Sequence, residues 1–154
     1  MGKIDARLAE LGVTLPTPAK PVANYVGWVR TGNLVFTAGQ VTLADGKFLH
    51  IGKVGAEISP EEANRGARLC AINVLAQLRE ACGGDLDRVK RIVKLVGFVN
   101  AVPQFTDHPK VVNGASDLMV EVFGDAGKHA RSAVGAGSLP LNVAVEVEAI
   151  AEIE

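Results

Sequence analysis

Three charged residues lie in a C-terminal segment that is otherwise apolar or small, HARSAVGAGSLPLNVAVEVEAIA (residues 129–151). Arg131 is near its start, and Glu146 and Glu148 are near its end. A guanidinium can hold a planar carboxylate through two parallel hydrogen bonds, and a carboxylate can accept a proton from an attacking water molecule. The same residue types also fit an internal ion pair between Arg131 and either glutamate. Residue types alone leave both interpretations open.

The last strand of the chain should position the two glutamates. In residues 142–153, Val145 and Val147 alternate with Glu146 and Glu148. A period of two residues is typical of a strand with one buried face. We therefore expect the valines to face a core and the glutamates to point to the opposite side of a sheet.

The arginine lies in another predicted strand, residues 130–136. Arg131, Ala133 and Gly135 should point to one side of it. Small residues beside a guanidinium leave room for a ligand rather than for packing. His129 is the histidine nearest to this group in sequence, and we expect it to be a solvated loop residue.

A long helix is the clearest element of the chain. It should begin at Ser59, an N-cap residue followed by Pro60 and, three residues after the cap, by Glu62. Glycines 83–84 should end it. Apolar residues recur along it at helical spacing: Ala67, Cys70, Ala71, Val74, Leu75, Leu78 and Cys82. One face of this helix should therefore lie on a sheet.

The other elements complete a mixed pattern. In chain order we expect a helix over residues 3–11, an extended proline-rich connector over 14–23, a hairpin turning at 31–33, a second turn at 45–46, a strand over 88–102 and a helix over 112–123. Two substantial helices and several strands predict an α+β fold, in which a mixed β-sheet has two helices packed on one face.

Composition excludes several classes of partner. The 154 residues are 48% hydrophobic and 21% charged, with a net charge of −1, which fits one globular domain over residues 1–154. No basic cluster is present to follow a phosphate backbone, so we expect no nucleic acid. No apolar run approaches the roughly 18 to 20 residues that span a bilayer, and we expect no membrane association. The N-terminal residues do not resemble a secretory signal, which favours a cytoplasmic location.

The cysteines and histidines predict no metal site. Cys70 and Cys82 lie on one predicted helix about 18 Å apart, so they cannot bond to each other. Two free thiols favour a reducing, cytoplasmic setting. His50, His108 and His129 are too widely spaced for a zinc-type pattern.

Four short segments agree in order and spacing with one known family. They are TAGQ (37–40), ARS (130–132), LP (139–140) and VEVEAIA (145–151). Together they resemble the RidA/YjgF family of reactive-imine deaminases, whose members are often labelled L-PSP endoribonucleases. The resemblance covers nearly the whole chain from Tyr25 onward. Residues 1–20, with their short helix, look like an N-terminal extension, and the segment around 102–112 also looks like an addition. Both indicate a divergent, longer subgroup.

The resemblance implies a chorismate-mutase-like subunit in a homotrimer with a barrel-like core and a cleft between each pair of subunits. It implies a hydrolase of the 2-iminobutanoate/2-iminopropanoate deaminase type, which converts 2-imino or enamine acids such as 2-aminoacrylate to 2-oxo acids and ammonia without a cofactor. By position, Arg131 would hold the substrate carboxylate and Glu146 would orient or activate water. Gly39 would offer backbone contacts, and Tyr25 would line the cleft from across the interface.

Two positions beside the presumed pocket depart from the family pattern. Ala38 stands where TSGQ commonly has serine, and Ala133 stands where cysteine often follows RS. Both changes remove polar side chains, so a second function stays open: a non-catalytic trimer that binds a small carboxylate or has a regulatory role. The balanced charge and the lack of an exposed histidine pair argue against a ribonuclease.

Overall fold

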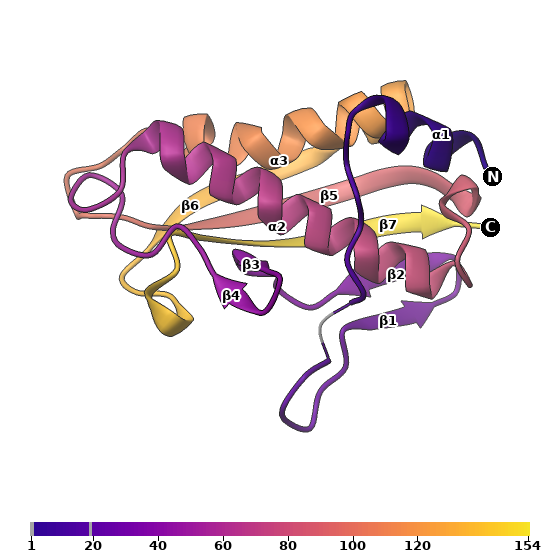
Figure 1. Cartoon of the computed structure of the whole chain (residues 1–154), viewed down its shortest axis with the longest axis horizontal. Coiled ribbons are helices and arrows are strands. Elements are labelled where there is room, and N and C mark those ends of the chain that lie inside the picture. The colour runs from indigo at the N-terminus through magenta and orange to yellow at the C-terminus, as the bar shows by residue number, and fades with distance from the viewer. Residues whose placement is uncertain (1, 19) are drawn as a thin grey trace.

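The structure is a computed structural model that describes residues 2–18 and 20–154 (Figure 1). Its helices are α1 (Lys3–Glu10), α2 (Pro60–Ala81) and α3 (His108–Phe123), and its strands are β1 (Trp28–Thr31), β2 (Leu34–Thr37), β3 (Leu43–Ala44), β4 (Lys47–Phe48), β5 (Val89–Asn100), β6 (Ala130–Ala136) and β7 (Val145–Ile153). The predicted α+β class is confirmed. No helix of the described residues is long and apolar enough to cross a membrane.

The main sheet has the strand order β1-β2-β7-β5-β6. Strands β5 and β6 pair in parallel, because α3 carries the chain across between them, and the other pairs are antiparallel. Strands β6 and β7 follow each other in sequence but are not neighbours, since β5 lies between them. The sheet is therefore mixed, as predicted, and β6 forms one of its edges.

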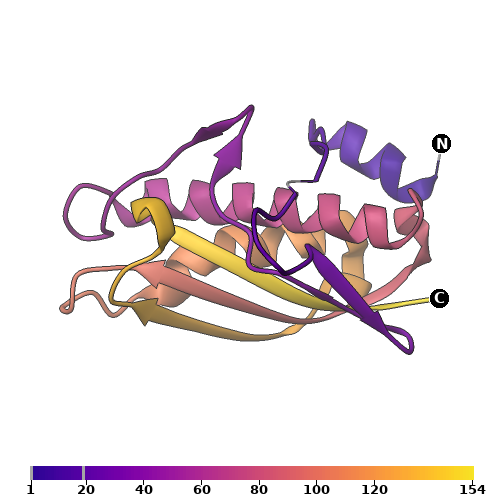
Figure 2. The same ribbon diagram turned by 90° about the horizontal axis from the view of Figure 1, so that it is seen from below.

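Helices α2 and α3 cover one face of this sheet (Figure 2), and α1 lies beside α3 (Figure 1). The core lies between the layers, where Leu75 and Leu118 of the helices and Leu95 and Val147 of the strands are fully buried. The prediction of two helices packed on one face is confirmed. None of the described helices or strands covers the opposite side of the sheet.

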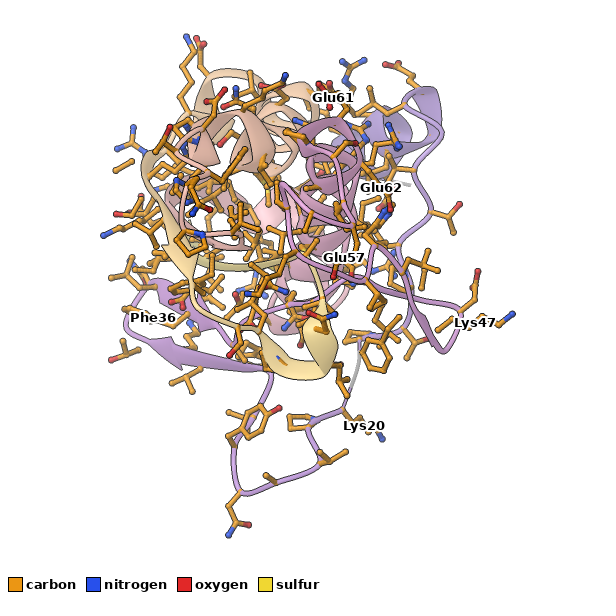
Figure 3. The ribbon with its side chains drawn as sticks, turned by 90° about the vertical axis from the view of Figure 1, so that its left-hand side faces the viewer. Lys20, Phe36, Lys47, Glu57, Glu61 and Glu62 are labelled. Carbon is orange, nitrogen blue, oxygen red and sulfur yellow. The ribbon has the colours of Figure 1, made fainter. Side chains whose placement is uncertain are left out.

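We call this uncovered side the open face. It carries Val29, Phe36, Val96, Phe98, Val134, Glu146, Glu148 and Ile150. Its apolar side chains are unusually accessible, with exposed fractions of 53% for Val29, 39% for Phe36 and 43% for Val134. Figure 3 shows Phe36 on the side of the molecule away from Glu61, which lies in the first turn of α2.

Local sequence signals explain most element boundaries. Helix α2 begins as predicted, because the hydroxyl of Ser59 accepts a hydrogen bond from the backbone N–H of Glu62 at 3.1 Å. Helix α3 begins at His108, four residues before the predicted start. Pro109 occupies its first turn, where a missing N–H leaves no intrahelical bond unmade. Strand β7 begins at Val145 rather than at residue 142, because Leu141 and Asn142 have positive φ angles of 58°, which do not fit a strand.

The N-terminal helix is held to the body by an acidic side chain. Asp87 accepts hydrogen bonds from the backbone N–H groups of Lys3 and Ile4 at 2.9 and 2.8 Å, and Leu8 is buried against the core. The predicted helix over residues 3–11 is thereby confirmed. Farther on, residues 20–27 project from the body, as the position of Lys20 in Figure 3 shows.

Candidate functional site

The guanidinium of Arg131 lies against α3 at the sheet edge. Arg131 pairs with buried Leu95, which places its side chain on the helix-covered side. Its Nη1 atom donates to Oδ1 of Asn113 at 2.7 Å and to Oγ of Ser116 at 3.2 Å. In the part of the chain that the structure describes, its Nε and Nη2 atoms have no hydrogen-bond partner. The two nitrogens that form the fork for a carboxylate are therefore free.

The internal ion-pair hypothesis is wrong for this subunit. None of the ion pairs among residues 2–18 and 20–154 includes Arg131. Glu146 pairs with Phe98 on β5, three positions from Leu95, the partner of Arg131. The two residues are thus separated by about 10 Å along the strands and about 10 Å across β5, and they point to opposite faces.

Glu146 is a partly buried carboxylate on the open face. Burial raises the pKa of its carboxyl above the ordinary value of 4.5, and the negative charge of Glu148 on the same strand raises it further. The described residues donate no hydrogen bond to this carboxylate. An unpaired carboxyl with a raised pKa holds a proton more readily than an ordinary carboxyl does, which suits a group that accepts and returns a proton.

Residues 38–39 form a β-bulge beside Glu146. Pairing between β2 and β7 runs to Phe36 opposite Ile150 and resumes at Gln40 opposite Val147. Three residues separate these pairs on the first strand and two on β7, so one residue is extra. Such bulges redirect the chain and often lie next to functional sites.

Gly39 brings its backbone directly against the glutamate. A Cβ atom at Gly39 would collide with Oε2 of Glu146, so the side chain of Glu146 lies in the space that glycine leaves open. The N–H and C=O groups of Gly39 make no hydrogen bond to any described residue. The structure thus presents a free amide next to the carboxylate of Glu146.

Tyr25 and the bulge line a small cavity. Its volume is about 120 Å³, and its walls include Tyr25, Ala38, Gly39 and Gln40. Tyr25 belongs to the projecting loop and is 57% exposed. The structure therefore brings three predicted site residues, Tyr25, Ala38 and Gly39, into one place, with Glu146 adjoining Gly39.

The other two predicted site residues lie elsewhere. Ala133 shares the covered side of β6 with Arg131, pairs with Gly97 and packs against the core. The candidate site is thus divided into an arginine half, Arg131 with Ala133, and a glutamate half, Glu146 with the bulge. A single subunit does not bring the two halves onto one small ligand.

Sequence reasoning missed three residues that contact the arginine or its partners. Asn113 and Ser116 bond Arg131 directly, and the imidazole of His129 contacts Oγ of Ser116 at 2.9 Å and the carbonyl of Gly127 at 2.7 Å. His129 precedes β6 as expected, but its ring is hydrogen-bonded rather than solvated. The i, i+3 spacing of Asn113 and Ser116 was the available signal, because it places both on one side of a helix.

The surroundings of Cys70 work against thiol chemistry. Burial raises the pKa of the Cys70 thiol, and the charge of Glu146 raises it further, so the reactive thiolate is disfavoured. Within the described residues, no group of three or more His, Cys, Asp or Glu side chains could hold a metal ion.

The fold and these two half-sites define a class of protein. It is an α+β subunit with a helical layer on one face, an open face on the other, and an uncompensated arginine and glutamate on different strands. Residues 5–153 match the family described as "YjgF/chorismate mutase-like, putative endoribonuclease". The chain belongs to this RidA/YjgF family, and the predicted chorismate-mutase-like fold is confirmed.

Similar proteins occur in Trypanosoma cruzi, Agrobacterium tumefaciens and Dermatophagoides farinae. Protein TCP17 of Trypanosoma cruzi is 46% identical over 99% of this chain and 95% of its own length. The crystal structure of Atu1372, a protein of unknown function from Agrobacterium tumefaciens, is 47% identical, with a TM-score of 0.93 over 98% of this chain and 92% of that one. The 2-iminobutanoate/2-iminopropanoate deaminase of Dermatophagoides farinae is 29% identical over 92% of this chain and 95% of its own length.

Proposed function

We propose that the chain forms a homotrimer that hydrolyses small 2-imino or enamine acids to 2-oxo acids and ammonia in clefts between subunits. The free fork of Arg131 is the observation that carries this proposal, because it is an uncompensated cation with the geometry for a carboxylate. The deaminase name of the Dermatophagoides farinae relative supports the reaction class.

The division of the site supports catalysis between copies. The arginine half lies at the β6 edge and the glutamate half lies on the open face, so a second copy has to supply the half that one subunit lacks. The exposed apolar residues Val29, Phe36 and Val134 give the open face the character of a contact surface. Tyr25, on the projecting loop, would line the cleft of a neighbouring copy.

The chemistry needs few groups. Arg131 anchors the substrate carboxylate, and an enamine first becomes the imine by taking a proton on carbon and losing one from nitrogen. Glu146 accepts a proton from the water molecule whose oxygen bonds to the imine carbon. The imine nitrogen gains a proton from solvent, which gives a tetrahedral intermediate with one hydroxyl and one amino group. Protonated Glu146 then returns its proton to the amino nitrogen, the C–N bond breaks, and the hydroxyl proton passes to solvent as the C=O bond forms. Ammonia leaves and the carbonyl of the 2-oxo acid remains.

One observation favours a second function. Ala38 and Ala133 add no polar side chain to either half of the site, so anchoring by Arg131 is better supported than turnover. The alternative is a trimer that binds a small carboxylate, such as a 2-oxo acid, without converting it. This function needs the arginine half and leaves Glu146 without a catalytic role.

An assay with enzymatically produced 2-aminoacrylate distinguishes the deaminase from the non-catalytic binding protein. A dehydratase acting on serine releases 2-aminoacrylate, and lactate dehydrogenase reports the pyruvate that forms from it. We expect the protein to accelerate pyruvate formation in proportion to its concentration. No acceleration at any concentration would contradict the deaminase function, and binding of 2-oxobutyrate without turnover would support the alternative.

Analytical ultracentrifugation tests the assembly. The species should have about three times the 16.1 kDa mass of the chain. Phe36→Glu puts a charge on the open face and should give a monomer. Val120→Glu is the matched control, because Val120 on α3 is 38% exposed, nearly as much as Phe36. A monomeric wild-type protein, or dissociation by the control alone, would contradict the proposed interface.

A further inference from the structure

Every group that holds the guanidinium of Arg131 is electrically neutral. Asn113 offers an amide oxygen and Ser116 offers a hydroxyl, which is itself held by the imidazole of His129. We propose that Asn113, Ser116 and His129 are positioning residues, which fix the arginine fork for a ligand carboxylate while leaving its charge uncompensated. This inference rests on the proposed binding of a carboxylate by Arg131.

We call the group of Asn113, Ser116 and His129 the relay. The chemistry of each hydrogen-bond partner determines which atom of the relay donates and which accepts. The carbonyl of Gly127 can only accept, so Nδ1 of His129 carries the hydrogen in that 2.7 Å contact. Nε2 of a neutral imidazole is then an acceptor, and the hydroxyl hydrogen of Ser116 points to it. The oxygen of Ser116 is left with its lone pairs for the Nη1 hydrogen of Arg131. One tautomer of His129 thus orients the hydroxyl toward its role as acceptor.

The relay is attached to rigid elements. Asn113 and Ser116 are three residues apart on α3, whose residues Val112 and Ala115 are fully buried. Arg131 is paired along β5 through the continuous parallel register of β6. A guanidinium held on Nη1 loses less freedom when a ligand binds Nε and Nη2, so binding gains affinity through preorganisation.

Arg68, which also packs against α3, shows what happens when the acceptor of an arginine is charged. Arg68 is held there by the carboxylate of Glu121 at 3.0 Å, which compensates its charge. Near Arg131 the same helix presents an amide and a hydroxyl, although Asp117 follows directly in sequence and makes no bond to the guanidinium. Neutral acceptors orient a cation without competing with an incoming anion. A carboxylate would also orient the cation, but it would compete with the anion for it.

Substitutions of Asn113 test the role of neutrality. Asn113→Asp keeps the acceptor oxygen at 2.7 Å from Nη1 but adds a negative charge. We expect it to weaken 2-oxobutyrate binding by roughly tenfold or more, measured by calorimetry, because the new carboxylate compensates Arg131. Asn33→Asp makes the same chemical change in the β1–β2 turn and should leave affinity unchanged.

Substitutions of the relay test the orientation. Ser116→Ala should weaken 2-oxobutyrate binding several-fold, Ser116→Thr should restore it, and His129→Gln should retain more affinity than His129→Ala. With 2-aminoacrylate, these changes should appear in KM and leave kcat nearly unchanged. In ¹⁵N NMR spectra of the ligand-free protein, slow rotation of the Arg131 guanidinium should be seen in the wild type and lost in Ser116→Ala.

The outcomes separate the two proposals. Wild-type protein that binds no 2-oxobutyrate would overturn the proposed carboxylate site, and the inference would fall with it. Wild-type binding that Asn113→Asp and Ser116→Ala leave unchanged would overturn the positioning role alone. The same holds if the guanidinium of Arg131 rotates freely in the wild type while 2-oxobutyrate still binds.

Discussion

The arginine half and the glutamate half of the site are organised in opposite ways. Arg131 lies on the covered side of the sheet, where two neutral groups of α3 accept hydrogen bonds from its guanidinium. Glu146 lies on the open face without a hydrogen bond from the described residues, and burial raises its pKa. The cation is positioned in advance, whereas the carboxylate is held next to a free backbone amide and lacks a partner.

This difference teaches which parts of the site a subunit can complete by itself. Packing of α3 on β6 is internal to the chain, so the arginine half is finished when the subunit folds. The glutamate half faces a surface that no described helix or strand covers, so in the proposed trimer a neighbouring copy would complete its surroundings. Catalysis would therefore be more sensitive to assembly than carboxylate binding is.

Loss of the arginine should have the largest effect. Arg131→Ala removes two charge-assisted hydrogen bonds to the ligand and should lower kcat/KM about 1,000-fold, or about 4 kcal/mol. Arg131→Lys keeps the charge without the fork and should recover only part of this loss. Steady-state kinetics with 2-aminoacrylate gives both values.

Stability provides the control for these variants. Arg131 is partly exposed and its partners are neutral, so its removal leaves no buried charge without a partner. The free energy of unfolding of Arg131→Ala should stay within about 1 kcal/mol of the wild type. A variant that fails to fold would show that the arginine is structural.

Loss of the glutamate should act on turnover alone. Glu146→Gln preserves shape but removes the proton acceptor, and kcat should fall roughly 100-fold while 2-oxobutyrate binding changes little. Glu148→Gln is the matched control on the same strand and should retain most of the activity. Equal losses in both variants would contradict the assignment of Glu146 as the base.

A substitution in the β-bulge at residues 38–39 should change both the stability and the activity of the protein. Gly39→Ala places a Cβ atom against Oε2 of Glu146, so the carboxylate or the bulge has to move. We expect a small loss, within about 1 kcal/mol, in urea unfolding because the end of the Glu146 side chain can move, together with reduced kcat because that carboxylate is displaced. Gly137→Ala has nothing within 4 Å of its added Cβ and should be nearly neutral. An unchanged Gly39→Ala protein would show that the contact is easily relieved.

Patterns local to the chain predicted most of the fold. The two-residue period of β7 placed Val145 and Val147 in the core and Glu146 on the other side, because strand geometry alone determines that alternation. Ser59 marked the start of α2 through a hydrogen bond within the helix itself. The start of α3 at His108 was missed because the segment before Pro109 also fits a loop.

Relations across the sheet could not be predicted in the same way. An ion pair between Arg131 and Glu146 would need β6 and β7 to lie side by side in the sheet, but β5 separates them. The contacts of Arg131 with Asn113 and Ser116 depend on the position of α3 over β6. That position is determined by packing of the whole core, and no local pattern encodes it.

The raised pKa of Glu146 should have the smallest effect, on stability as a function of pH. The folded protein binds this proton more tightly than the unfolded chain, whose carboxyl has a pKa near 4.5. Ionisation therefore costs the folded state free energy that is absent below pH 4.5 and fully present above the raised pKa. Glu146→Gln should then be more stable than the wild type at pH 8, and the difference should shrink toward zero near pH 4.

Urea unfolding at fixed protein concentration measures this difference at each pH. Glu148→Gln offers the comparison, because removal of that charge should lower the pKa of Glu146 and shift the transition to lower pH. The acid limb of kcat/KM should move in the same direction, since the base has to be ionised to accept a proton. The stability difference between wild type and Glu146→Gln could also stay constant with pH. That result would show that the carboxyl of Glu146 titrates alike in the folded and unfolded chain. The contrast between the two halves of the site would then rest on hydrogen bonding alone.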